Sequence, residues 1–228
     1  MVTLVFLCRR RPDITHDEYV ARVLGGHVPL ALRHHPTLRR YVVSIVEEAA
    51  EGAPPLDSIA ELGFASFADY AERLYDSPEG ERIIARDVAG FLGGADAYVT
   101  GERDPRPAPR RLGERSPGVK LIAGVVRPPG VGSDESLRGW IASGRAGAMC
   151  AKTFVERRLG GGPDYGAFMW LTGADANALR RRLPHADGPL HVYGVAEYII
   201  RARSDRLGTP GARPARRRPR GSTPRSSG

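Results

Sequence analysis

The strongest constraint on the fold is a layout of strand and helix signals that occurs twice along the chain. The segment VTLVFLCRRRPDITHDEYVARVL, from Val2, and the segment VKLIAGVVRPPGVGSDESLRGWI, from Val119, share it. Each has an apolar strand, an Arg-Pro pair, a hydroxyl residue that can cap a helix, acidic residues and then an apolar helix. Because such self-similarity is the signature of repeated structural units, we expect two similar lobes in one chain.

In the first half, the signals follow the order strand, helix, strand, strand, helix, strand. A strand over residues 2–8 precedes a helix that begins at His16, where Thr15 and Glu18 have the spacing of a capping box. The later elements are strands over residues 38–48 and 56–66, a helix capped by Ser66, further helical turns from Ser77 and a strand over residues 95–103. This order is the split-βαβ, ferredoxin-like pattern.

The second half is predicted to repeat this order, and the chain divides accordingly. We expect a lobe over residues 1–103, a proline-rich linker over 104–118, a second lobe over 119–203 and a tail over 204–228. A four-stranded sheet with both helices on one face leaves the other face apolar, and a second such sheet can cover it. Each lobe keeps a cleft between its sheet and its helices.

The net charge of +8 is concentrated in the C-terminal tail. Of the 34 basic and 26 acidic residues, nine arginines and one aspartate lie in Arg201–Gly228, which leaves 25 of each sign in the rest of the chain. The tail has almost no apolar surface to bury, so we expect it to be disordered. A solvated tail is the plain interpretation, and non-specific binding of nucleic acid or an acidic partner is the alternative.

Other classes of protein find no support in the sequence. No apolar run reaches the roughly 18 residues of a membrane span, and the N-terminal arginines follow the apolar run, the reverse of a signal peptide. We therefore expect a cytoplasmic protein. Cys8 and Cys150 form no CxxC pair, and there is no P-loop, no GxGxxG after a strand, no GxSxG and no HExxH. No metal or other cofactor is expected.

Four short motifs occur in one order along the first half. They are His-x-Pro-Leu at His27–Leu30, Pro-x-Leu-x-Arg-Tyr at Pro36–Tyr41, Ala-Glu-Leu at Ala60–Leu62 and Ser-Pro-Glu-Gly at Ser77–Gly80. In this order the motifs resemble the EthD-like branch of the dimeric α+β barrel superfamily, over residues 2 to about 103. The resemblance implies an α+β fold in which two tandem ferredoxin-like lobes form an intrachain barrel, the second lobe being degenerate.

The resemblance also implies a range of activities. Relatives include enzymes that act on polyketide-type aromatic or quinonoid intermediates: cyclases, dehydratases, decarboxylases and cofactor-free monooxygenases. Val23 stands where the family often has tryptophan, and Gly25-Gly26 replaces bulkier residues, which implies a roomier site. Whether two such chains pair further as a homodimer is left open.

His27 is the first catalytic candidate. Pro29 has no N–H, so the carbonyl of Gly25 loses its usual helical donor, and we expect a kink that turns His27 toward the cleft. An imidazole can take a proton from an activated carbon or hydroxyl and return it elsewhere. The alternative is a structural histidine that binds backbone.

His34 and His35 lie just before Pro36, which ends the helix. Cations in a last helical turn interact favourably with the helix dipole, so we expect two capping histidines, with His35 exposed. A metal site shared by His27 and His34, two turns apart, is the alternative, although no third ligand at helical spacing lies nearby.

The next strands supply further candidates. Arg40 and Ser44 share one face of their strand and Tyr41 lies on the other, so only one set can face the cleft. There, Tyr41 would bind a substrate oxygen or Arg40 would stabilise an enolate; structural use of either residue is the alternative. Glu61, in an apolar strand, needs a partner, for which His27 and Arg40 are candidates, unless it faces an edge.

The leading hypothesis is a cofactor-independent lyase or cyclase that cyclises and dehydrates a small, oxygenated, polyketide-like molecule. His27, Glu61 and Tyr41 are the expected catalytic residues. The expected substrate-binding residues are Arg40, Ser44, Val23, Phe64 and Asp87. A cofactor-free monooxygenase of aromatic intermediates and a noncatalytic ligand-binding barrel are the alternatives.

Overall fold

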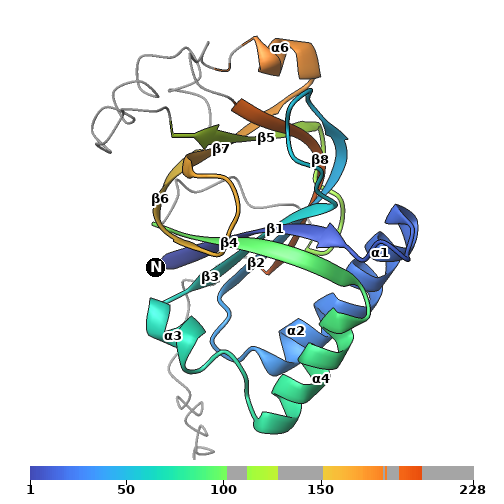
Figure 1. The fold of residues 1–228 in the computed structure, drawn as a ribbon, viewed down its shortest axis with the longest axis vertical. Helices are drawn as coiled ribbons and strands as arrows, with labels where there is room; N and C mark the ends of the chain where they lie inside the picture. The colour runs from blue at the N-terminus through green and yellow to red at the C-terminus, as the bar shows by residue number, and fades with distance from the viewer. Residues whose placement is uncertain (102–111, 128–150, 182, 184–189, 202–228) are drawn as a thin grey trace, which may run out of the picture.

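Eight antiparallel strands close into a barrel in the computed structural model, which describes residues 1–101, 112–127, 151–181, 183 and 190–201 (Figure 1). The strands are β1 (Val2–Arg10), β2 (Arg40–Ala49), β3 (Ser58–Phe64), β4 (Leu92–Thr100), β5 (Val119–Val126), β6 (Ala151–Leu159), β7 (Tyr165–Gly173) and β8 (Leu190–Arg201). The helical elements are α1 (His16–Ala21), the π-helical turn η1 (Arg22–His27), α2 (Val28–His34), α3 (Phe67–Ala71), α4 (Pro78–Ala89) and α6 (Ala176–Arg180).

The strand order around the barrel is β1-β3-β2-β8-β5-β7-β6-β4. Within each half the strands therefore follow the same order, β4-β1-β3-β2 in the first and β8-β5-β7-β6 in the second. The halves join edge to edge, through the pairs β2–β8 and β4–β6. The predicted α+β class and the barrel are confirmed. The tandem ferredoxin-like lobes stay a prediction, because the first crossover of the second half, with its expected helix after Ser133, lies outside the described residues.

Three apolar clusters follow from the alternation of side chains along the strands. The barrel interior is filled from both halves, with Val5 and Ile59 from the first and Phe168 and Trp170 from the second among its members. A second cluster lies between the first-half strands and α1, η1, α2 and α4, and a third lies under α6. Figure 1 shows α1, α2 and α4 on one side of the barrel and α6 on the opposite side.

The predicted helix starts are confirmed. Thr15 accepts from the Glu18 N–H while the Glu18 carboxylate accepts from the Thr15 N–H, which completes the capping box of α1. Ser66 caps α3 in the same way, although that helix ends already at Ala71. Ser77 caps α4, whose first turn carries Pro78, as expected of a residue without an N–H.

Part of the predicted linker pairs with the barrel. The Gly113 N–H donates to the Ile199 carbonyl at 2.8 Å and the Ser116 N–H donates to the Glu197 carbonyl at 2.7 Å. Residues 102–111 and the tail from residue 202 lie outside the described part of the chain. Within that part, no helix has the length and apolar character needed to cross a membrane.

Candidate active site

The strands and helices of the first half enclose a cavity of about 240 Å³, which is the volume of about eight water molecules. Its floor consists of helix-facing side chains of the first four strands, such as Phe6, Cys8, Tyr41 and Ser58, and its walls come from the helices. Among the described residues that line it, none is an aspartate, glutamate, lysine or arginine. The cavity is therefore suited to a small, largely apolar molecule.

One wall of the cavity is a stripe of every fourth residue: Tyr19, Val23, His27, Ala31 and His35. In a regular α-helix, residues four apart drift by about 40° per step, so five of them would spread over about 160°. The π-helical turn η1, whose end donates a backbone N–H to the Val23 carbonyl five residues earlier, has more residues per turn and offsets part of this drift. The π-helical turn thus keeps the whole stripe on the cavity.

The structure has this wider turn in place of the kink predicted at His27. His27 has helical dihedral angles, φ −64° and ψ −45°, and the helix passes through it into α2 without a break. Pro29 cannot donate to the Gly25 carbonyl, but a segment in which donors reach back five residues does not depend on that bond. The outcome for His27 is the predicted one, because its side chain lines the cavity.

His27 is held by a carboxylate from the neighbouring helix. Its Nδ1 lies 2.8 Å from Oδ2 of Asp87 on α4, and its ring lies 5.2 Å from the ring of Phe91, centroid to centroid. A carboxylate accepts hydrogen bonds, so Nδ1 carries the proton of this bond and Nε2 is the nitrogen left for a ligand. Asp87, expected to contact substrate, is not among the lining residues and acts on His27.

Of the two alternatives for β2, the structure places the Tyr41 face on the cavity. Tyr41 and Val43 line the cavity, while Val46, two residues on from Ser44 on the opposite face, lies in the barrel interior. The expectation that Arg40 and Ser44 bind substrate in this cleft is therefore wrong, because alternate side chains of a strand point to opposite sides of the sheet.

Glu61 also faces the barrel interior, because Ala60 and Leu62 on either side of it line the cavity. Its carboxylate is fully buried and lies 3.7 Å from an Arg40 guanidinium nitrogen. Of the two predicted partners of Glu61, Arg40 lies beside its carboxylate and His27 does not. The assignment of Glu61 to the His27 site is thus wrong, because the sheet separates the two side chains.

The remaining predicted contacts have different outcomes. Val23 lines the cavity, and the expectation of a site roomier than in the family stays a prediction. Phe64 is fully buried on the helix-facing side of β3, where its ring packs 5.7 Å from that of Tyr70, and it is not among the lining residues. Tyr70 itself lines the cavity, so Phe64 supports the wall from behind.

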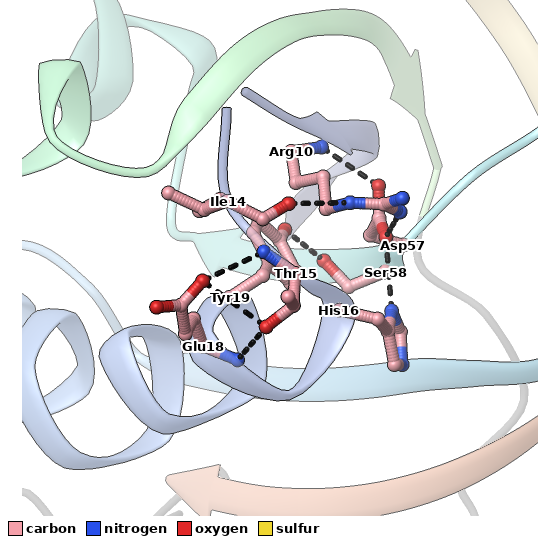
Figure 2. Close-up of polar contacts among 8 residues, drawn as sticks. All are labelled: Arg10, Ile14, Thr15, His16, Glu18, Tyr19, Asp57 and Ser58. Atoms are coloured by element: carbon pink, nitrogen blue, oxygen red, sulfur yellow. Dashed lines mark hydrogen bonds and ion pairs between the residues drawn. The ribbon is translucent and has the colours of Figure 1, made fainter. Parts of the chain in front are cut away.

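A hydrogen-bonded pair at the cavity floor was not predicted. The Tyr19 hydroxyl lies 2.7 Å from Oγ of Ser58. Figure 2 shows this pair beside Asp57, whose carboxylate accepts from the Arg10 N–H at 2.7 Å and its guanidinium at 2.6 Å and lies 2.9 Å from Nδ1 of His16. Asp57 thereby ties the start of α1 to the end of β1 and the start of β3, which fixes Tyr19 over the floor.

The hydroxyl and thiol groups of the cavity are neutral at physiological pH. Burial raises the pKa of the Cys8 thiol to about 11 and raises the pKa of both Tyr19 and Tyr41 far above the usual value for a phenol. Neutral phenols and thiols can donate hydrogen bonds, so these groups suit a ligand with carbonyl or hydroxyl oxygens.

His34 and His35, for which the same capping role was predicted, lie in different surroundings. Nδ1 of His34 lies 3.1 Å from an Asp76 carboxylate oxygen. His35 is buried, with 4% of its surface exposed, and lines the cavity, so the expectation of an exposed His35 is wrong. The signal that could have found it is the spacing of four residues that links it to His27.

No group of three or more His, Cys, Asp or Glu side chains among the described residues is arranged to hold a metal ion.

In the second half, His191 bonds to the Tyr165 hydroxyl at 2.6 Å, and His185 lies outside the described part.

Most of the residues that line the cavity lie in a part of the chain that matches a known domain. Residues 11–95 match the EthD domain, in agreement with the resemblance found in the sequence. An anthrone oxidase-like protein of known structure is similar over 87% of this chain and 92% of its own, with 10% identity and a TM-score of 0.49. A mutant chlorite dismutase from Candidatus Nitrospira defluvii is similar over 86% and 90%, with 10% identity and a TM-score of 0.45. The comparison with curated proteins gives no match.

Proposed function

From the premise that residues 11–95 form an EthD domain, we propose that the chain is a cofactor-independent enzyme that acts on a small, oxygenated, largely apolar molecule in this cavity. His27 is the general acid and base. The observation that carries the proposal is the 2.8 Å contact of His27 Nδ1 with Asp87, at the wall of an apolar cavity, which leaves Nε2 for the ligand.

The proposed reaction is cyclisation followed by loss of water. Nε2 of His27 takes a proton from a carbon next to a carbonyl group, and the resulting enolate carbon attacks a second carbonyl carbon of the same molecule. The protonated imidazole then gives this proton to the alkoxide oxygen, which becomes a hydroxyl group. Nε2 of His27 next takes a second proton from the adjacent carbon and passes it to that hydroxyl, which leaves as water as the carbon–carbon double bond forms. Asp87 keeps the imidazole in one orientation throughout, and the Tyr41 phenol is placed to donate to the enolate oxygen.

Deuterium exchange tests the first step without knowledge of the natural substrate. β-Tetralone is a bicyclic ketone with acidic protons next to its carbonyl group, and proton NMR in heavy water follows their replacement. The wild-type protein should accelerate the exchange. In His27→Ala the exchange rate should fall by a factor of about 10² to 10⁴, the usual contribution of a general base. Unchanged exchange in His27→Ala would refute the mechanism.

His34→Ala is the matched control. This histidine lies on the same helix and also contacts an aspartate, but it does not line the cavity. The variant should exchange β-tetralone protons at the wild-type rate.

The noncatalytic ligand-binding barrel is favoured by one observation, the apolar lining of the cavity, which suffices to bind a molecule without chemistry. In that case β-tetralone would bind to the wild-type protein with no acceleration of exchange. Consumption of dissolved oxygen during the same incubation would instead favour a monooxygenase.

A further inference from the structure

His35 lies in the cavity two helical turns beyond His27 and has one fixed hydrogen bond. Its Nδ1 lies 3.1 Å from the backbone carbonyl of Leu74. A carbonyl oxygen can only accept, so the ring nitrogen at this contact carries a hydrogen. The Leu74 carbonyl therefore fixes which nitrogen of the neutral ring is protonated.

The ring is neutral at physiological pH. Burial is the largest effect and lowers the pKa of His35. Hydrogen bonds to the backbone of Leu74 and His34 oppose this, the neighbouring imidazoles of His27 and His34 add to it, and the pKa is lowered on balance. In a neutral ring with its hydrogen on Nδ1, Nε2 is a lone-pair acceptor.

This acceptor has no protein donor within the described ranges. Nδ1 of the ring contacts the Leu74 carbonyl, the ring of Tyr75 lies 5.3 Å away, centroid to centroid, and the backbone of His34 also interacts with the ring. The residue lines the cavity with 4% of its surface exposed. Nε2 is not among the fully buried polar atoms that lack a partner, so it is open to the cavity, where a ligand hydroxyl group can donate to it.

His27 lies in the middle of this helical wall and His35 at its end. Eight residues separate His27 from His35, about 12 Å at 1.5 Å per residue, and the small Ala31 lies between them. A ligand along this wall can meet an acceptor at His35 while its reactive carbon lies at His27.

We propose that His35 determines specificity by accepting a hydrogen bond from a hydroxyl group of the substrate, remote from the group that reacts at His27. This inference rests on the proposed function. The substrate is therefore a neutral phenol or alcohol with an apolar body. Carboxylates and phosphates are disfavoured, because they bring no donor for Nε2 and the lining residues within the described ranges supply no lysine or arginine.

Binding of β-naphthol and its methyl ether, measured by isothermal titration calorimetry, tests the inference. The two probes share their ring system, but only β-naphthol can donate a hydrogen bond. The wild-type protein should bind β-naphthol about tenfold more tightly, the typical net contribution of one hydrogen bond. His35→Phe should abolish the preference and His35→Gln, whose amide oxygen accepts, should restore part of it. Equal affinities in the wild-type protein, or an unchanged preference in His35→Phe, would overturn the inference.

Nitrogen NMR of the imidazole rings avoids reliance on a variant that fails to fold. In the wild-type protein, β-naphthol should shift the Nε2 resonance of His35 and the methyl ether should not. A shift of the His27 resonance alone would place the hydroxyl group of β-naphthol at His27 and overturn the inference.

The same measurements separate this inference from the proposed function, because they need no turnover. A preference for β-naphthol that persists in His27→Ala, without exchange of β-tetralone by the wild-type protein, would support His35 and refute the enzyme. Exchange of β-tetralone protons without a preference for β-naphthol would support the enzyme and refute the role of His35. Failure of both probes to bind would overturn both.

Discussion

Replacing Ala31 by leucine tests whether the cavity is space kept for a ligand. Ala31 is 1% exposed and lies on the cavity wall between His27 and His35. Leucine adds three carbon atoms at a helical position, and each buried methylene contributes about 0.8 kcal/mol when it finds empty apolar space. With about 240 Å³ available, the free energy of unfolding of Ala31→Leu should rise by up to about 2.4 kcal/mol.

Urea denaturation measures this change, and titration with β-naphthol measures what it costs in function. The stabilised variant should lose β-naphthol binding, because the leucine occupies the volume of the ligand. In a fully packed core the same substitution would force neighbouring side chains aside and destabilise the protein by about 1–3 kcal/mol. A destabilised variant, or a stabilised variant that still binds at wild-type affinity, would refute the cavity as the binding site.

Ala21→Leu controls for the intrinsic effect of leucine in a helix. Ala21 lies at the end of α1 and is exposed, so its substitution adds no buried surface. The free energy of unfolding should change by no more than about 0.5 kcal/mol, and the affinity for β-naphthol should not change.

Two predictions concern titrating groups beside the cavity. Burial opposes ionisation of Asp57, but the bonds from the Arg10 N–H, His16 and the Arg10 guanidinium outweigh it and lower the pKa of Asp57. The charged carboxylate therefore stabilises the fold above the unfolded-state pKa near 3.9, and this contribution is lost as the pH falls through the lower folded-state value. Asp57→Asn should lower the free energy of unfolding by about 1.5 kcal/mol at pH 7. Urea denaturation at decreasing pH should show the difference between the wild-type protein and the variant shrink. A difference that does not depend on pH would contradict this prediction. Because burial raises the pKa of Cys8 to about 11, iodoacetamide at pH 8 should alkylate this thiol about two orders of magnitude more slowly in the folded than in the urea-unfolded protein. Peptide mass spectrometry resolves it from Cys150, and equal rates would contradict the raised pKa.

The sequence was sufficient to predict elements whose signals are local. Thr15 and Ser66 cap helices as expected, since a capping box depends on residues three apart. The strands are present because the apolar alternation that predicts them also packs them. The π-helical turn at Gly25-Gly26 could not be predicted, since the loss of the Pro29 donor is met equally by a kink or by a wider turn.

The candidate site was only partly predictable, because alternation gives two faces of a strand but does not say which one faces the helices. Tyr41 and Arg40 were equivalent in this respect, and the choice depends on the closed barrel, which needs partners from the other half. His35 was assigned to solvent because the sequence shows a helix end there and not the chain segment around Leu74 that covers it.

The sheet of the first half separates two chemical environments, and this separation bears on how His27 could work as a base. Glu61 with Arg40, and Glu197 with Lys120, meet inside the barrel. On the other face, the described lining residues of the cavity carry no full charge apart from what the histidines gain on protonation. A fixed carboxylate in contact with the ligand would bind water and oppose the formation of an enolate by repulsion, both of which slow proton abstraction. The alternation that sends Glu61 to one face and Ala60 and Leu62 to the other keeps such a charge out. In the proposed reaction, the developing negative charge would meet, among the described lining residues, the imidazolium of His27 and neutral donors such as Tyr41, and this arrangement favours an enolate.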